Sequence, residues 1–149
     1  MIVKFAEQCD IDHWMDLVNK VKDNFPGLES TEALNVHKCT VLDFMSKASA
    51  ICAKVDDQIV GTLLFSRDNN MLCFLAVDED YRRQHVAENM IAYMLPFMNP
   101  EKEIIVTTYR EGVSEGIAAR AFYKRLGFVE GNLTEEFGCP VQEFVLKLD

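Results

Sequence analysis

The sequence predicts an α/β (α+β) fold in which a mixed sheet of six to seven strands is flanked by about four helices. Strand-like and helix-like segments follow one another in the order β, α, α, three strands, α, β, α, β. Short polar turns join the three central strands, which is typical of antiparallel hairpins. The length of 149 residues suits one core, so we expect residues 1–149 to form a single domain.

In the N-terminal third, apolar residues first alternate with the period of a strand and then recur with the period of a helix over two segments. "IVKFA" has the period of a strand, and Asp10 is placed to cap a helix that Pro26 and Gly27 would end. A second helix is expected over residues 30–47. The apolar positions expected to make contacts on the two helices are Ile11, Trp14, Val18, Val21, Phe25, Leu34, Val41, Leu42 and Met45.

Three strands are expected over 49–55, 59–66 and 71–77. The third, "MLCFLAV", is apolar without alternation, which predicts burial on both faces at the centre of the sheet. Cys52 and Cys73 lie inside these runs and are expected to be small buried side chains.

The C-terminal half predicts a helix, a strand, a helix and a last strand. The first helix follows an arginine pair and should end near Pro96, and "EIIVTTY" should be the next strand. A helix over 114–128 closes at Gly127, and "VQEFVLKL" alternates as the last strand. The apolar stripes of the two helices are Val86, Met90, Met94 and Phe97, and then Ala119, Phe122, Tyr123 and Leu126.

Composition excludes several classes of function. The net charge of −9 argues against nucleic-acid binding and against an anionic membrane surface, and it mildly favours a cationic small molecule. No apolar stretch reaches the ~18–20 residues that span a bilayer. Five cysteines without CxxC spacing indicate a reducing compartment, so we expect a cytoplasmic protein. The histidines show no ligand spacing, so we expect no metal.

An arginine pair stands where a strand gives way to a helix. The strand should end near Val77 and the helix should begin near Gln84, with Arg82 and Arg83 between them. The start of a helix presents unpaired amides and partial positive charge, which together bind phosphate groups. The alternative is a solvated pair that only marks the beginning of the helix.

Two segments resemble the GNAT superfamily of acyl-CoA N-acyltransferases. "AARAFYKRLGF" is similar to that family's A-x-x-F/L-Y-x-x-x-G-F motif, and the segment 82–87 resembles its R/Q-x-x-G-x-G/A pyrophosphate loop. Two positions depart from the pattern. His85 stands where the loop usually has glycine, and Gly116 stands where many members have asparagine. The residues that match the helix motif are Ala119, Phe122, Tyr123, Gly127 and Phe128.

The resemblance implies transfer of an acetyl group from acetyl-CoA to a primary amine by direct attack in a ternary complex. It implies that the backbone amide of Leu75 polarises the thioester carbonyl and that Tyr123 protonates the leaving thiolate. The cofactor-binding residues that it implies are Leu75, Ala76, Val77, Arg82, Arg83, Gln84, His85, Val86, Ala87, Glu88, Ala119, Phe122 and Tyr123.

The acceptor is expected to be a small molecule or a peptide, held between the first two helices and the fifth strand. The turn of residues 25–30 is the expected lid, and the resemblance makes a homodimer the default expectation. A non-catalytic acyl-CoA-binding regulatory module and a purely structural domain are the alternatives. Met71 occupies the place of a glutamate that some relatives use as a base. The candidate pocket residues are Trp14, Phe25 and Tyr109, and the candidate bases are Glu29, Glu32, Glu111 and Glu115.

Overall fold

The computed structural model describes residues 1–25, 27–136 and 138–147. Every predicted strand and helix is present, and one further strand, β6, was not predicted. The elements are β1 (Ile2–Phe5), α1 (Ile11–Val21), α2 (Thr31–Ser46), β2 (Ala50–Val55), β3 (Gln58–Ser66), β4 (Met71–Val77), α3 (Val86–Met94), β5 (Ile104–Tyr109), α4 (Ile117–Arg125), β6 (Val129–Glu136) and β7 (Cys139–Leu146).

The strands of the described residues form one mixed sheet in the order β1-β2-β3-β4-β5-β7-β6. The pairs β1–β2, β2–β3, β5–β7 and β6–β7 are antiparallel. The start of β4 runs parallel to β5, with Met71 opposite Ile105 and Leu72 opposite Val106. A sheet that mixes both kinds of pairing, with helices between its strands, confirms the predicted fold class.

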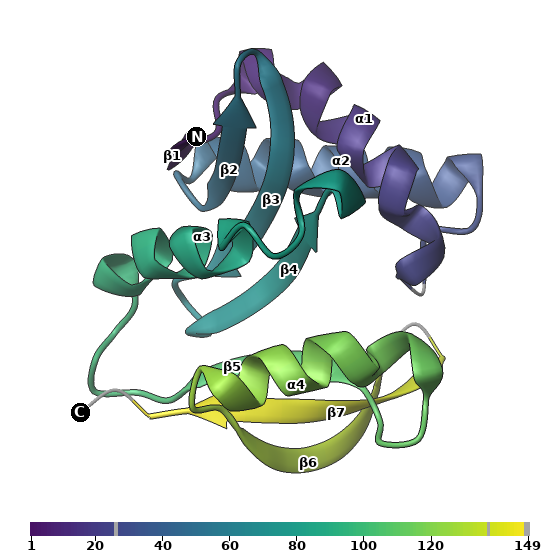
Figure 1. Ribbon diagram of the computed structural model, residues 1–149, viewed down its shortest axis with the longest axis vertical. Coiled ribbons are helices and arrows are strands. Elements are labelled where there is room, and N and C mark those ends of the chain that lie inside the picture. Colours follow the sequence, from purple (N-terminus) through teal and green to yellow (C-terminus); the bar gives the residue numbers. More distant parts are fainter. Residues whose placement is uncertain (26, 137, 148–149) are drawn as a thin grey trace. The chain divides into compact units, whose positions relative to one another are not determined.

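The chain divides into two compact units (Figure 1). The first comprises residues 1–66 and 73–97, and the second comprises residues 67–72 and 98–149. The described residues contain no helix with the length and apolar character that a membrane span needs.

The first unit packs helices on both faces of β2 and β3. Leu64 of β3 and Cys52 of β2 lie in a buried cluster with apolar residues of α1 and α2. On the opposite face, the Cβ position of Gly61 points at Val86 and Met90 of α3. Successive side chains of a strand alternate between faces, so Gly61 and Leu64, three residues apart on β3, face opposite sides of the sheet.

Helices α1 and α2 form much as their sequences predict. Trp14 and Val18 of α1 and Val41 of α2 are buried with no exposed surface. Ser30 caps α2, because its Oγ accepts a hydrogen bond from the Ala33 amide at 3.0 Å. Pro26, which was predicted to help end the first helix, lies outside the described residues; α1 itself ends at Val21.

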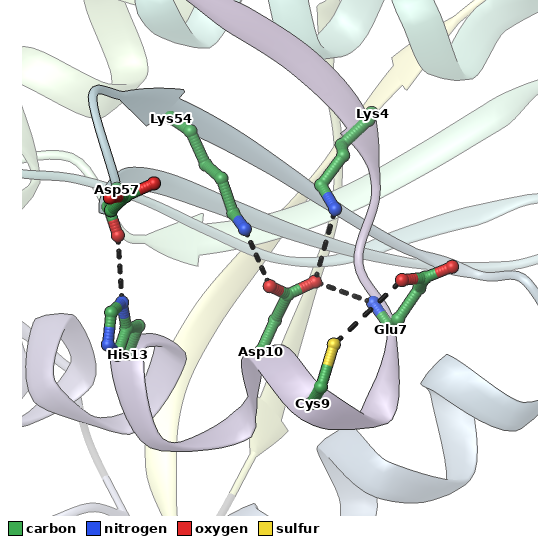
Figure 2. Close-up of polar contacts among 7 residues, drawn as sticks. All are labelled: Lys4, Glu7, Cys9, Asp10, His13, Lys54 and Asp57. Atoms are coloured by element: carbon green, nitrogen blue, oxygen red, sulfur yellow. Dashed lines mark hydrogen bonds and ion pairs between the residues drawn. The ribbon is translucent and has the colours of Figure 1, made fainter.

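Asp10 stands at the start of α1, but its carboxylate caps no amide of that helix, which corrects the prediction. It accepts a hydrogen bond from the Glu7 amide at 2.9 Å and pairs with Lys54 at 2.6 Å and Lys4 at 3.5 Å (Figure 2). The lysines reach it from β1 and β2, so this carboxylate ties the start of α1 to the sheet.

The prediction that β4 is buried on both faces is wrong. Leu72 and Ala76 are buried, and Phe74 packs against the core cluster of α1 and α2, but Cys73 is exposed. Leu72, Phe74 and Ala76 share one face of the strand, and Cys73 belongs to the other because side chains alternate. Apolar residues on that second face are therefore not explained by the core of the first unit.

Helix α3 begins at Val86, two residues after the predicted start. Val86, Met90 and Met94 are buried as expected, whereas Phe97 is 38% exposed. Phe97 lies beyond the helix in the turn Leu95–Phe97, where its ring meets the ring of Phe5 edge-on with centroids 5.0 Å apart.

The second unit contains β6, the strand that sequence reasoning missed. It pairs with β7 from Val129 to Glu136 and forms an edge of the sheet. Its sequence, VEGNLTEE, is rich in charged and turn-forming residues, and Val129 and Leu133 are exposed. Edge strands often carry charges that discourage pairing with other chains, and such charges hide the strand pattern.

Candidate functional site

The segment between β4 and α3 is anchored by a carboxylate. Asp78 is 7% exposed, accepts a hydrogen bond from the Asp80 amide at 3.0 Å, and pairs with Lys20 of α1 at 2.7 Å. Burial alone would raise the pKa of Asp78, but the hydrogen bonds from Lys20 and the Asp80 amide, with the charge of Lys20, lower it below its usual value. The start of the loop is therefore fixed to α1.

The backbone of this loop adopts conformations that glycine normally supplies. Arg83 has a φ of +65° and His85 has a φ of +61°, both in the left-handed region. Each such residue costs roughly 1–2 kcal/mol relative to a right-handed conformation. The backbone at His85 therefore keeps the shape of a glycine loop although the glycine is absent.

The loop opens onto the first amides of α3. His85 is the N-cap residue and makes no side-chain cap; its Nδ1 instead lies 3.2 Å from Oε2 of Glu88. Arg82, Arg83, Gln84 and His85 are exposed, so solvent reaches this end of the helix. The first amides of a helix, with two arginines in the loop that directly precedes it, are a combination that suits an anion.

The position of α3 is set by a close approach to β3. A Cβ on Gly61 would lie 2.7 Å from Cγ1 of Val86 and 2.8 Å from Cε of Met90. Both distances are shorter than carbon atoms tolerate, so only glycine lets the first turn of α3 lie against the strand. Gly61 was not singled out from the sequence, where its place in an apolar run gave no signal.

The second face of β4 carries Leu75 and Val77, which are half-buried, and the exposed Cys73. Ala76, between Leu75 and Val77, is buried on the opposite face. The strand therefore presents apolar side chains that the core of the first unit does not use.

Tyr123 lies on α4 in the second unit and is 6% exposed. Its ring meets Phe122 and Phe128 with centroids 5.5 Å apart and Phe144 at 6.1 Å. Burial raises the pKa of the Tyr123 phenol above its ordinary value, so the hydroxyl keeps its proton at neutral pH. Ala119 and Phe122, on the same helix, are half-buried.

A buried arginine that the sequence analysis missed holds α4 in place. Arg120 is 6% exposed, and its Nη1 donates to the Tyr109 carbonyl at 2.9 Å and to Oε1 of Gln142 at 2.8 Å. Its Nη2 donates to Glu130 at 3.0 Å, and the guanidinium lies 4.9 Å from the centre of the Phe144 ring. Arg120 therefore joins α4 to β5, β6 and β7. Both Arg120 and Tyr123 contact the ring of Phe144.

The glycine at position 116 has a local explanation. A Cβ there would lie 2.5 Å from Cβ of Tyr109, at the end of β5. The packing leaves no room for the asparagine that many relatives carry, so this departure from the family pattern follows from the contact with Tyr109.

The residues predicted to line the acceptor pocket or to act as a base differ in their exposure to solvent. Trp14 has no exposed surface, so it belongs to the core and does not line a pocket. Phe25 is half-buried and its ring lies 4.6 Å from that of Phe74, and Tyr109 is half-buried in the second unit. Pro26, in the expected lid, lies outside the described residues. The four candidate glutamates, Glu29, Glu32, Glu111 and Glu115, are exposed.

Glu7, Cys9 and Asp10 have potential ligand atoms within 4.8 Å of one another. The Asp10 carboxylate is already held by two lysines and an amide, and Sγ of Cys9 lies 3.8 Å from Oε2 of Glu7 (Figure 2). The group is thus explained by ion pairs and by the start of α1.

Residues 31–148 match the family model described as an acetyltransferase (GNAT) domain. The chain belongs to the GNAT acetyltransferase family. It is therefore an acyl-CoA-dependent N-acetyltransferase, which favours the enzyme over the non-catalytic alternatives. No curated protein matches the chain.

Solved structures of this GNAT protein's relatives share its fold. A GNAT-family acetyltransferase from Bacillus cereus is 19% identical, with a TM-score of 0.76 over 98% of this chain and 96% of that one. An N-acetyltransferase from Staphylococcus aureus is 13% identical, with a TM-score of 0.76 over 98% and 100%. The PaiA N-acetyltransferase from Thermoplasma acidophilum, in complex with coenzyme A, is 14% identical, with a TM-score of 0.70 over 95% and 96%.

Proposed function

We propose that the protein moves an acetyl group from acetyl-CoA to a primary amine of a small molecule or peptide, by direct attack of the amine. The observation that carries this proposal is the loop before α3. There, Arg82 and Arg83 directly precede the first turn of α3, and the backbone keeps a glycine-like shape at Arg83 and His85. A strained loop of this kind persists where it has a function to serve.

The diphosphate of acetyl-CoA is the anion that we assign to this loop. The amides of Val86, Ala87 and Glu88, in the first turn of α3, would donate to its oxygens, and the two arginines would add charge-assisted hydrogen bonds. Gln84 and His85 complete the loop. Ala119 and Phe122, on α4, are further cofactor contacts that the resemblance assigns.

The acyl transfer then requires a donor to the carbonyl oxygen. We assign this role to the Leu75 amide on β4, with Ala76 and Val77 beside the pantetheine arm. The amine nitrogen attacks the thioester carbon, a C–N bond forms and the C–S bond breaks. The oxyanion that develops between these steps is stabilised by the amide, which can contribute about 3 kcal/mol.

The leaving thiolate needs a proton, and we assign the donor to Tyr123. The raised pKa of its buried phenol keeps the proton on the hydroxyl until a thiolate is present. The proton lost by the attacking nitrogen passes to solvent, and solvent restores the proton of Tyr123. A neutral amine and acetyl-CoA thus give the amide and the free thiol with no net proton change.

Reversal of the arginine charges tests the assignment of the diphosphate. We expect Arg82→Glu/Arg83→Glu to weaken acetyl-CoA binding by about 100-fold or more, because each charge-assisted hydrogen bond contributes about 1.5–3 kcal/mol. Calorimetric titration with acetyl-CoA measures the change. Arg67→Glu, an exposed reversal in the turn before β4, is the matched control and should bind as the wild type does. Equal binding by the double variant would contradict the assignment.

Removal of one hydroxyl tests Tyr123. We expect Tyr123→Phe to lower kcat by about 10²–10⁴-fold, the range of general acid catalysis, with little effect on the affinity for acetyl-CoA. The phenyl ring preserves the contacts with Phe128 and Phe144. Thiol release at saturating acetyl-CoA measures kcat. Full turnover by this variant would remove Tyr123 from the mechanism.

A further inference from the structure

Helix α4 of the second unit carries two nearly buried side chains, Arg120 and Tyr123, which are each 6% exposed. They stand three residues apart, so they lie on one face of the helix. Both contact the fully buried ring of Phe144 on β7. The guanidinium carbon of Arg120 lies 4.9 Å from the centre of that ring, and the ring centroid of Tyr123 lies 6.1 Å from it. The ring of Phe144 therefore links the arginine to the tyrosine.

The guanidinium of Arg120 donates to one residue on each of the three strands over which α4 lies (Figure 1). These are the carbonyl of Tyr109 on β5 at 2.9 Å, Oε1 of Gln142 on β7 at 2.8 Å, and Oε1 of Glu130 on β6 at 3.0 Å. Gln142 is itself fixed, because its Nε2 donates to the Gly131 carbonyl at 3.1 Å. The planar fork of an arginine holds its partners in set directions. This arrangement therefore opposes rotation of α4 about its own axis.

Glu130 balances the buried charge of Arg120, and its carboxylate also pairs with Lys124 of α4 at 2.6 Å. The hydrogen bond from Lys124, with the charges of Lys124 and Arg120, lowers the pKa of Glu130, so this carboxylate is ionised at neutral pH. A buried ion pair often adds little stability, because the loss of hydration offsets the attraction between the charges. An apolar side chain at position 120 could fill the same volume, but its contacts would not select one rotation of α4.

The rotation of α4 decides where the hydroxyl of Tyr123 lies. Side chains reach about 5–6 Å from a helix axis, so a rotation of roughly 10° moves their ends by about 1 Å. A displacement of about 1 Å in a reacting group can lower a rate roughly 100-fold. This step rests on the proposed function, because it takes Tyr123 as the group that protonates the leaving thiolate.

We propose that Arg120 is a positioning residue for the acyl transfer: it fixes the rotation of α4 and thereby the place of the Tyr123 hydroxyl. The hydrogen bonds of Arg120 to β5, β6 and β7 set the rotation of the helix. The ring of Phe144 passes the constraint on, because it packs against both side chains. Arg120 therefore acts on the rate of turnover and not on the affinity for acetyl-CoA, whose diphosphate we assign to the loop before α3.

A double-mutant cycle tests whether Arg120 acts through Tyr123. Its members are the wild type, Arg120→Met, Tyr123→Phe and Arg120→Met/Tyr123→Phe. Hydroxylamine, a small amine that is neutral at pH 7, serves as the acceptor probe at one fixed concentration. Thiol release at saturating acetyl-CoA, corrected for the uncatalysed reaction, measures turnover. We expect Arg120→Met to lower turnover by roughly tenfold or more in the wild-type background, and by less than about twofold in the Tyr123→Phe background.

A general loosening of the second unit predicts a different result. It would lower turnover by the same factor in both backgrounds, and that outcome would overturn the proposal, as would turnover of Arg120→Met within about twofold of the wild type. Calorimetric titration should show that Arg120→Met binds acetyl-CoA nearly as the wild type does; a loss of affinity as large as the loss of turnover also overturns it.

Arg125→Met is the matched control for Arg120→Met. Arg125 is also an arginine of α4 beside a ring, with its guanidinium carbon 5.8 Å from the centre of the Phe122 ring, but it is exposed. We expect this variant to turn over at the wild-type rate. A loss equal to that of Arg120→Met would show that any arginine removed from α4 has the same effect, and it would overturn the proposal.

A crystal structure of Arg120→Met with coenzyme A separates this inference from the proposed function. We expect the Tyr123 hydroxyl to move by about 1 Å or more relative to the sulfur, compared with the wild-type complex. An unchanged position would overturn the role of Arg120. If Arg120→Met does not fold, Gln142→Leu removes one partner of the guanidinium and replaces it in both experiments, with the same deciding outcomes. A wild-type complex whose Tyr123 hydroxyl faces away from the sulfur would instead contradict the proposed function.

Discussion

His85 holds a backbone conformation that usually belongs to glycine. Its φ is +61°, and its imidazole is 72% exposed and contacts Glu88, whose side chain is 45% exposed. The neighbouring Arg83 is also left-handed, with a φ of +65°. The two left-handed residues therefore raise the free energy of the folded protein, and they lie directly before the first amides of α3.

Replacement of this histidine by glycine should relieve part of that cost. We expect His85→Gly to stabilise the fold by about 1 kcal/mol, because glycine adopts a left-handed φ without a steric penalty. The midpoint of urea unfolding measures the change. His85→Ala is the matched control, since it removes the imidazole but keeps a Cβ at a positive φ. If alanine stabilises as much as glycine does, the imidazole and not the backbone carries the cost.

At the scale of elements, the start of α3 depends on the absence of a side chain in β3. Gly61→Ala would place a methyl group 2.7 Å from Cγ1 of Val86. We expect a loss of about 1–3 kcal/mol, as in other overpacked cores. Calorimetric titration should also show weaker acetyl-CoA binding, because α3 must shift. Gly61→Ala/Val86→Ala removes the clash with Val86 and leaves only the flexible end of Met90 to move, so it should recover part of the affinity; a double variant that recovers none would place the fault elsewhere.

The same contacts explain what could be read from the sequence. Helices α1 and α2 were predictable because their apolar residues repeat with the helical period and one face meets a core. Strand β6 was not, because an exposed edge strand has no face that must be apolar. On β4, apolar residues face both ways but only one face meets the core of its unit, so composition alone overstated the burial of Cys73.

Some residues of the candidate site could be predicted from the sequence and others could not. Arg82, Arg83 and Tyr123 belong to motifs, which a sequence displays directly. The role of Arg120 depends on partners far along the chain, namely Tyr109 and Gln142. A charged residue on a helix gives no local sign of such partners, so only the tertiary contacts reveal them.

At the scale of the whole molecule, a chain with a net charge of −9 keeps two of its carboxylates out of solvent. The side chains of Asp10 and Asp78 are 7% and 10% exposed, and each pairs with a lysine, at 2.6 and 2.7 Å. Burial would raise the pKa of Asp10, but the Glu7 amide and the charges of Lys54 and Lys4 lower it. Asp78 has a lowered pKa for similar reasons.

These lowered pKa values set the sign of the response to acid. The unfolded chain takes up protons at an ordinary pKa near 3.9, whereas the folded carboxylates resist protonation. Their contribution to stability is therefore complete above that ordinary pKa and is lost as the pH falls through the lower, folded values. We expect the free energy of unfolding, measured with urea between pH 7 and pH 3, to decline below about pH 5.

Neutral substitutions should remove this part of the pH dependence. We expect Asp78→Asn to cost about 1.5–3 kcal/mol at pH 7, where the charged hydrogen bond with Lys20 is lost, and to cost less at pH 3. Asp10→Asn should behave alike through Lys54. Asp12→Asn, in the exposed first turn of α1, is the matched control and should leave the slope unchanged. If Asp78→Asn keeps the wild-type slope, other carboxylates govern unfolding in acid.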